Sequence, residues 1–188
     1  LLAHSKLLHQ KVGGAGAKPY DLKVSFKPMN PDGAPNVYRR SMYTYWKRTG
    51  PTPVMMALDA SKRDVCTVRR ERTNSASQAL ILLNGIQFVE AARAFADQLI
   101  IQHGPENPAG LINDAFRKLT SRYPTEKEAI ILSQLLSEQK EQFSDPKETE
   151  KFLKVGYYKA KSKDLSHLAA VTTFVSALMN FAETISKR

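Results

Sequence analysis

The sequence contains very little cysteine and no long apolar run. Cys66 is the single cysteine among 188 residues, which excludes an internal disulfide and a C-x-x-C-H haem attachment site within the chain. No stretch approaches the ~20 apolar residues of a membrane helix, so no membrane span is predicted. The four histidines form no motif with Cys66, and no metal site and no cofactor are predicted in this chain.

A starting methionine and a signal peptide are also missing. Residues 1–8 are apolar at positions 1, 2, 7 and 8, which indicates the tail of a helix that begins outside the chain. We therefore expect a piece of a larger protein.

Acidic residues are scarce in the first part of the chain. Residues 1–74 hold 14 Lys/Arg against 5 Asp/Glu, whereas residues 75–188 hold 14 against 13. The net charge of +10 is thus almost wholly a property of residues 1–74. Such an asymmetry favours an anionic partner for that part, unless acids elsewhere in the parent protein balance it.

Apolar periodicity predicts a mainly α fold from residue 75 onward. Residues recurring every three or four positions indicate about six helices. Their expected ranges are 75–83, 86–103, from 108, from 126, from 146 to near 156, and 165–185. Thr125 with Glu128 forms a capping-box pattern, and the last helix is apolar over a wide arc, which places it centrally.

Residues 1–74 are predicted to be an irregular basic segment, and residues 75–188 a helical bundle, the two together forming one compact unit. Gly13 and Gly14 end the opening helix. Residues 38–48 alternate in a way typical of a short strand or extended segment packed on the helices. Pro51 and Pro53 then keep the chain extended.

Two clusters in the basic segment interleave cations with aromatic residues. Arginine offers a planar fork for carboxylate, sulfate or phosphate groups, and aromatic rings stack on sugars or hold guanidinium groups. An anionic-glycan site is one interpretation, and arginines that satisfy backbone carbonyls of irregular chain are the other. The candidate ligand-binding residues are Arg39, Arg40, Tyr43, Tyr45, Trp46, Lys47, Arg48, Arg69, Arg70 and Arg72.

Two further hypotheses concern chemistry and nucleic acid. In an enzyme, part of whose site lies in missing domains, Asp59 is a candidate acid or base, with Cys66 or Ser41 as nucleophile. No catalytic motif links these residues, so we lean against an enzyme for this chain alone. Nucleic-acid binding is disfavoured because no recognisable motif accompanies the basic residues.

The same segment resembles a planctomycete-specific C-terminal domain of unknown function. The resemblance is carried by Tyr38-Arg39-Arg40-Ser41-Met42-Tyr43-Thr44-Tyr45-Trp46-Lys47-Arg48-Thr49 and continues through Cys66-Thr67-Val68-Arg69-Arg70. It extends to Phe88-Val89-Glu90-Ala91-Ala92-Arg93 and to Leu178-Met179-Asn180-Phe181-Ala182-Glu183. It therefore covers nearly all of the chain.

The resemblance implies a setting for the chain but no activity. Members are usually large exported proteins with cytochrome c-type domains, so the resemblance implies a periplasmic or cell-surface location and leaves room for a haem c in the missing N-terminal part of the parent. The partners it implies are neighbouring domains of that parent. The resulting hypothesis is a structural or binding module that takes an anionic polysaccharide. The alternative is part of a hydrolase or haem-linked oxidoreductase site.

Overall fold

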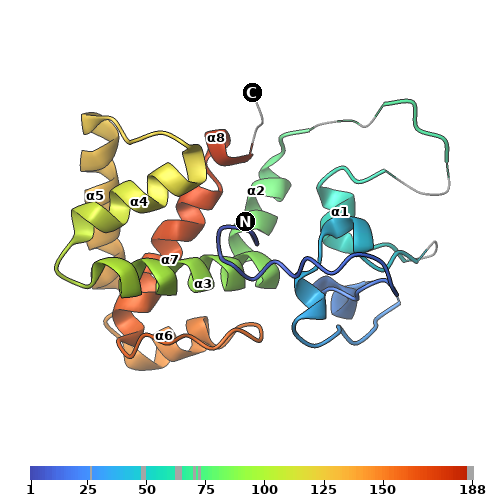
Figure 1. Cartoon of the computed structure of the whole chain (residues 1–188), viewed down its shortest axis with the longest axis horizontal. Helices are drawn as coiled ribbons and strands as arrows, with labels where there is room; N and C mark the ends of the chain where they lie inside the picture. The colour runs from blue at the N-terminus through green and yellow to red at the C-terminus, as the bar shows by residue number, and fades with distance from the viewer. Residues whose placement is uncertain (26, 48–49, 62–64, 70, 72, 186–188) are drawn as a thin grey trace. The chain divides into compact units, whose positions relative to one another are not determined.

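The chain is mainly helical in the computed structural model (Figure 1), which describes residues 1–25, 27–47, 50–61, 65–69, 71 and 73–185. Eight α-helices and no sheet lie within these residues, so the predicted fold class is confirmed. The chain divides into two compact units. Unit 1 comprises residues 1–6 and 87–188, and unit 2 comprises residues 7–86.

Unit 1 is built on three long helices and a central apolar one. In chain order, it contains α3 (Ile86–His103, whose first residue belongs to unit 2), α4 (Pro108–Thr120), α5 (Glu126–Gln142), α6 (Pro146–Leu153), α7 (Leu165–Met179) and α8 (Ala182–Ile185). Helix α7 packs against α4, α5, α6 and α8. Ten of its residues are buried, which confirms the prediction that this apolar helix is central.

The starts of these helices follow local rules that the sequence displays. Thr125 and Glu128 form the predicted capping box at α5, in which each side chain accepts a hydrogen bond from the other residue's backbone N–H. Asn107 and Asp145 cap α4 and α6, each followed by a proline at the first helical position. These helices therefore begin within a residue or two of the predicted positions.

The last predicted helix, 165–185, is broken into two helices at residues 180–181. Helix α7 ends at Met179, and α8 begins only at Ala182. The N–H of Phe181 bonds to the carbonyl of Leu178, a tight turn that redirects the chain. The Arg122 side chain then holds Glu183 of α8 at 2.9 Å between Nε and Oε2.

The prediction that the chain opens with the tail of a helix is also wrong. Residues 1–6 form turns, with N–H donation from Ser5 to Leu1 and from Lys6 to Ala3. Lys6 has a φ of 56°, a left-handed conformation that ends the turn. Leu1 instead packs on the core of unit 1.

Unit 2 consists of short turns and two helices. Its elements are η1 (Tyr20–Val24), η2 (Asn36–Tyr38), η3 (Ser41–Tyr43), α1 (Pro53–Ala57) and α2 (Ala76–Asn84). Of the two alternatives for residues 38–48, a strand or an extended segment, the strand does not form in the described residues. They contain η3, and Arg39 and Thr44 are extended and make two isolated parallel bridges, His9–Arg39 and Ala17–Thr44. The expectation of extended chain after Pro53 is wrong too, because this proline occupies the first turn of α1.

No single helix among the described residues is both long and apolar enough to cross a membrane. Taken together, α2 and α3 reach that length and composition as a bent pair.

Candidate anion-binding site

Arg39 is the most deeply placed of the predicted ligand-binding residues that the structure describes. It is 6% exposed, and its guanidinium donates hydrogen bonds to the carbonyls of Ala15 at 2.8 Å, Gly13 at 2.6 Å and Lys11 at 3.1 Å. The same group lies 4.3 Å from the ring centroid of Tyr43. The Arg39 guanidinium thus satisfies backbone carbonyls of irregular chain inside unit 2. This is the role that the alternative to an anionic-glycan site predicted for the arginines.

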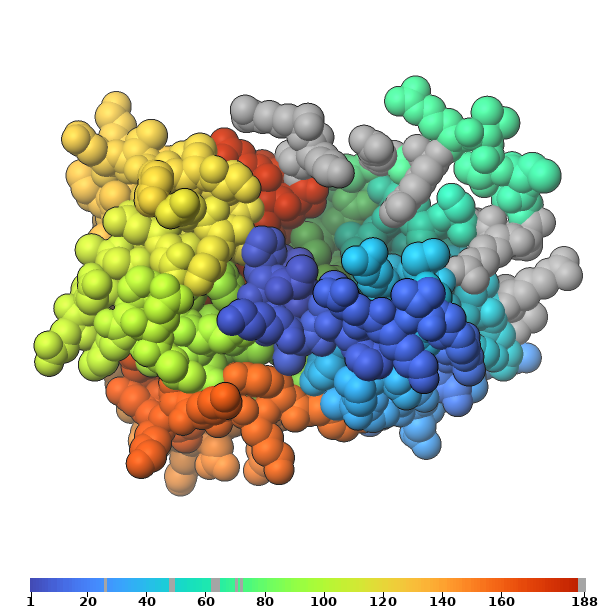
Figure 2. Space-filling model, viewed as in Figure 1, coloured from blue at the N-terminus to red at the C-terminus, as the bar shows by residue number. Residues whose placement is uncertain are grey.

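Gly13 and Gly14 explain the shape of the segment that Arg39 holds. Both have a positive φ, of 76° and 83°, a region that glycine enters at little cost. They turn the carbonyls of Lys11, Gly13 and Ala15 toward one guanidinium. In the space-filling view, this blue segment lies on the visible surface (Figure 2), and residues 10–16 are exposed.

The other predicted ligand-binding residues differ in exposure. Arg40 and Arg69 are exposed, whereas the three aromatic residues and the lysine of the first cluster are half-buried. These four are Tyr43, Tyr45, Trp46 and Lys47. Arg48, Arg70 and Arg72 lie outside the described residues. Whether the cluster binds a ligand stays a prediction.

Two carboxylates of unit 2 accept hydrogen bonds from neutral backbone donors. Asp21 accepts the N–H of Val54 at 2.9 Å, at the start of α1. Asp32 accepts the N–H of Lys18 at 3.1 Å. Burial raises the pKa of Asp21, and the bond from Val54 opposes that shift.

Asp59, a candidate acid or base, lies in a small polar cluster. Its Oδ2 accepts hydrogen bonds from the Thr73 N–H at 2.8 Å, the Thr73 hydroxyl at 2.8 Å and the Gln78 side chain at 3.1 Å. Cys66 and Ser41, the candidate nucleophiles, are exposed. Thr73 and Gln78 are thus among the residues that hold Asp59 in place, and the catalytic assignment stays a prediction.

Unit 1 contains a second polar cluster that the sequence analysis did not single out. Glu90, Arg93 and Asp97 lie on one face of α3, at spacings of three and four residues. All three are buried, with exposed fractions of 1%, 6% and 0%. The sequence offered one signal for this cluster: charged residues stand among the alanines and the phenylalanine of α3. A charge that is buried in this way requires a partner.

The partner of this face is the loop of residues 154–164 between α6 and α7. Glu90 Oε1 accepts the N–H groups of Tyr157 at 2.5 Å and Tyr158 at 2.6 Å. Arg93 donates to the Tyr158 carbonyl at 2.6 Å. Side chains of one helix therefore fix a loop that lies 65 to 68 residues away in sequence.

Asp97 holds the far end of the same loop. It accepts the N–H groups of Lys161 and Ser162, each at 2.9 Å, and the Tyr158 hydroxyl at 2.7 Å. Desolvation of the carboxyl opposes ionisation, yet these three donors together lower the pKa of Asp97. Burial, the Asp97 hydrogen bond and the Asp97 charge raise the pKa of Tyr158, so its proton is retained.

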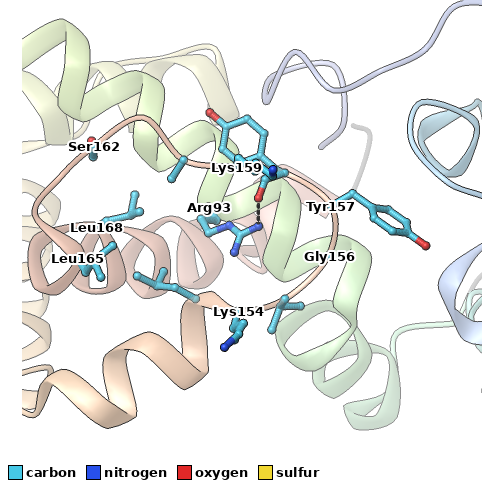
Figure 3. Close-up of a pocket in the computed structure, with 12 residues that line it drawn as sticks. Arg93, Lys154, Gly156, Tyr157, Lys159, Ser162, Leu165 and Leu168 are labelled. Carbon is cyan, nitrogen blue, oxygen red and sulfur yellow. Dashed lines mark hydrogen bonds between the residues drawn. The ribbon is translucent and has the colours of Figure 1, made fainter.

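The loop borders an open cavity of about 440 Å³ over Arg93 (Figure 3). Leu153, Val155, Leu165 and Leu168 supply apolar wall. Glu90 and Asp97 do not line it, whereas Lys154 and Lys159 do. The cavity is therefore apolar and cationic.

A family model matches residues 1–136 of the chain: PSD1, protein of unknown function (DUF1553). The chain belongs to this family. At the level of a domain of unknown function, the resemblance seen in the sequence is confirmed. No curated protein and no solved structure matches the chain. The matched residues of this DUF1553 chain include all of unit 2, whereas the loop that borders the cavity lies beyond them.

Metal-binding geometry is not found in the part of the chain that the structure describes. No group of three or more His, Cys, Asp or Glu side chains is placed there to hold an ion.

Proposed function

We propose that this DUF1553 chain is a non-catalytic module of a larger exported protein, in which unit 2 binds an anionic polysaccharide. Neighbouring domains of the parent would be its other partners. The observation that carries the proposal is the charge of unit 2. Residues 7–86 hold 13 Lys/Arg against 5 Asp/Glu, a surplus of 8, while unit 1 holds 15 against 13.

The geometry of two of the five acids of unit 2 agrees with this argument. Asp21 and Asp32 accept hydrogen bonds from neutral backbone N–H groups. In unit 1, by contrast, Asp114, Glu128 and Glu183 each pair with a cationic side chain. Since unit 2 has more cations than acids to pair with them, its surplus positive charge acts on its surroundings, where it attracts a polyanion.

Several cations of unit 2 are exposed and able to meet such a ligand. They are Lys11, Lys23, Lys27, Arg40 and Arg69. Arg39 has a different role in this proposal, since its donors hold residues 11–15. It supports the surface from which Lys11 and Arg40 project.

A charge-matched pair of double variants tests the proposal. In Arg40→Gln/Arg69→Gln, two exposed cations are removed from unit 2. In Lys127→Gln/Lys151→Gln, two exposed cations are removed from α5 and α6 of unit 1. Binding to chondroitin sulfate and to neutral dextran would be measured by isothermal titration calorimetry from 50 to 300 mM salt, roughly the range over which the Debye length shortens through 10 Å.

We expect the wild type to bind chondroitin sulfate, with affinity falling as salt rises, and not to bind dextran. The unit 2 double variant should bind about tenfold more weakly, since exposed ion pairs contribute about 1 kcal/mol or less each. The unit 1 double variant should bind like the wild type. Equal losses in both variants, or no binding by the wild type, would contradict the proposal.

A further inference from the structure

We propose that the backbone N–H groups of Val12, Gly14 and Gly16 bind sulfate groups of an anionic polysaccharide. These residues belong to the exposed segment 10–16 of unit 2. The inference rests on the function proposed for unit 2 and deepens it, because it names the atoms of one contact and the chemical class of the anion.

Alternate carbonyl groups of this segment face one buried cation. The Arg39 guanidinium donates hydrogen bonds to the carbonyls of Lys11, Gly13 and Ala15. The peptide bonds of the segment are trans, and in a planar trans peptide the C=O of one residue and the N–H of the next point in opposite directions. The N–H groups that follow the three carbonyls therefore point away from Arg39. They are those of Val12, Gly14 and Gly16.

The three outward N–H groups are accessible and have no protein partner. Among the residues that the structure describes, none accepts a hydrogen bond from a backbone N–H of residues 10–16. All of these residues are exposed, and Val12 is 81% exposed. The segment lies within the blue surface of the space-filling view (Figure 2). An oxyanion can therefore reach the donors without displacing another part of the protein.

Arg39 gives the outer side of the segment a positive polarity. Its guanidinium is 6% exposed, and its hydrogen-bond acceptors are three neutral carbonyls rather than a carboxylate. Each of the three peptide dipoles, of about 3.5 D, thus has its negative end at Arg39 and its positive end toward solvent. Lys11 adds an exposed charge, and the first acid of the sequence is Asp21. Such a surface attracts an anion.

The segment is fixed at both ends as well as in the middle. At one end, the N–H of His9 donates to the carbonyl of Tyr38 at 3.0 Å. At the other end, the N–H of Ala17 donates to the carbonyl of Tyr43 at 2.8 Å. The donors are therefore held in position before a ligand binds, which lowers the entropic cost of binding.

The type of donor favours sulfate over carboxylate. A planar carboxylate is matched best by the two parallel donors of an arginine, but the guanidinium of Arg39 is turned inward. The outer side offers single N–H donors and the point charge of Lys11. A tetrahedral sulfate has oxygens in several directions and can accept from such single donors.

The direction of the donors favours a polymer over a free ion. Because the three carbonyls converge on one guanidinium, the N–H groups on the opposite sides of their peptides diverge. One small ion cannot contact all three, whereas a polysaccharide with a sulfate in each repeat presents several anions along its chain.

Amide shifts of the wild-type chain test the contact directly. Chondroitin sulfate would be titrated into isotope-labelled protein, and hyaluronan, which carries carboxylates but no sulfate, is the comparison. With chondroitin sulfate, the amide protons of residues 12, 14 and 16 should move downfield by more than that of Gly33, another exposed glycine of unit 2. Hyaluronan should move them less and bind about tenfold more weakly.

Val12→Pro removes one of the three donors, because proline has no N–H. Val68→Pro is the matched control, since Val68 is also an exposed valine of unit 2 and its N–H likewise has no acceptor among the described residues. Chondroitin sulfate should bind about tenfold more weakly to Val12→Pro and equally well to Val68→Pro. Hydrogen exchange at the Ala17 amide should stay at the wild-type rate in both variants. If Val12→Pro changes that rate, the wild-type shifts decide the matter.

Three results would overturn the inference. They are shifts at residues 12, 14 and 16 no larger than that of Gly33, equal affinities of Val12→Pro and Val68→Pro, and hyaluronan bound as tightly as chondroitin sulfate. Each of them leaves the polysaccharide proposal standing if Arg40→Gln/Arg69→Gln still weakens binding, because that test concerns side-chain cations. No binding of chondroitin sulfate by the wild type would instead overturn the function proposed for unit 2.

Discussion

Gly156 lies against the carboxylate of Glu90, so closely that a β-carbon on Gly156 would overlap both carboxylate oxygens. Its φ is 75°, a conformation that side-chain-bearing residues rarely adopt. The glycine lets the N–H groups of Tyr157 and Tyr158 reach Glu90. A buried acid on α3 thus depends on the absence of a side chain in a loop far along the chain.

Gly156→Ala should destabilise unit 1 by about 2 to 4 kcal/mol, because left-handed strain of about 1–2 kcal/mol adds to the displacement of Glu90 from its donors. Gly104→Ala is the control, since Gly104 has a φ of 68° but open space where a β-carbon would stand. It should lose only about 1 kcal/mol. Urea unfolding of both variants would measure the difference, and equal losses would show that the Glu90 contact contributes nothing.

Asp97→Asn should also be costly, although it changes few atoms. The amide nitrogen replaces one acceptor oxygen with a donor, and that donor would face a backbone N–H or the Tyr158 hydroxyl. We expect a loss of about 2 to 4 kcal/mol in urea unfolding, typical of a buried charge whose partners are left unsatisfied.

Asp114→Asn provides the comparison for this variant. Asp114 is partly exposed and pairs with Lys118 and His103 on the surface of unit 1. Its replacement should cost about 1 kcal/mol or less. If Asp97→Asn costs no more than Asp114→Asn, the hydrogen bonds of Asp97 do not hold the loop.

The helices were predictable because their determinants are local. Thr125 with Glu128, and Asp145 before Pro146, act within one turn, and each helix begins where these residues stand. The break between α7 and α8 was not predictable in this way, because an apolar stripe continues through it. The contact that holds α8 beyond the break is tertiary, the pair of Arg122 with Glu183, 61 residues apart, and the local sequence does not display it.

The candidate sites were predictable only in composition. As an arginine, Arg39 could be expected to bind either an anion or backbone carbonyls. The three carbonyls that it binds lie 24 to 28 residues earlier in the sequence, and no sequence pattern identifies them. Glu90, Arg93 and Asp97 fit a helix face by spacing, yet they bond backbone groups of a distant loop. Any residue supplies such groups, so no motif reveals them.

Arg39 and its neighbour Arg40 offer a sharp comparison of a buried and an exposed arginine. In Arg39→Lys the charge is kept, but a lysine cannot reach the carbonyls of Lys11, Gly13 and Ala15 with the same planar fork. We expect a loss of about 2 kcal/mol. Hydrogen–deuterium exchange at the amides of residues 11–17 should rise with it, which would localise the effect to unit 2.

Arg40→Lys should leave both stability and exchange unchanged within about 0.5 kcal/mol, as is usual for exposed positions. A loss in Arg40→Lys equal to that in Arg39→Lys would contradict the assignment of Arg39 as the internal anchor.

Glu128 should make part of the stability of unit 1 dependent on pH. The Arg122 side chain, and then the Thr125 N–H, lower the pKa of Glu128 from 4.5 to about 2. A folded-state pKa below the unfolded value means that the contribution is fully present above about pH 4.5 and is lost as pH falls through about 2. The thermal midpoint of unfolding should therefore decrease as the pH is lowered from about 4.5 to about 2.

Glu128→Gln should flatten this fall, because the variant has no carboxyl to protonate at position 128. Some slope should remain, since hydrogen bonds also lower the pKa values of Asp97 and Asp114. Glu141→Gln, which removes an exposed acid of α5 from a position outside the Arg122 pair, should retain the full slope.

Thermal midpoints measured from about pH 6 to about pH 2 span the two pKa values of Glu128 and would show whether the Arg122 pair supplies the pH dependence. Parallel curves for Glu128→Gln and Glu141→Gln would show that the Arg122 pair does not supply the dependence, whereas a flatter curve for Glu128→Gln alone assigns it to that pair.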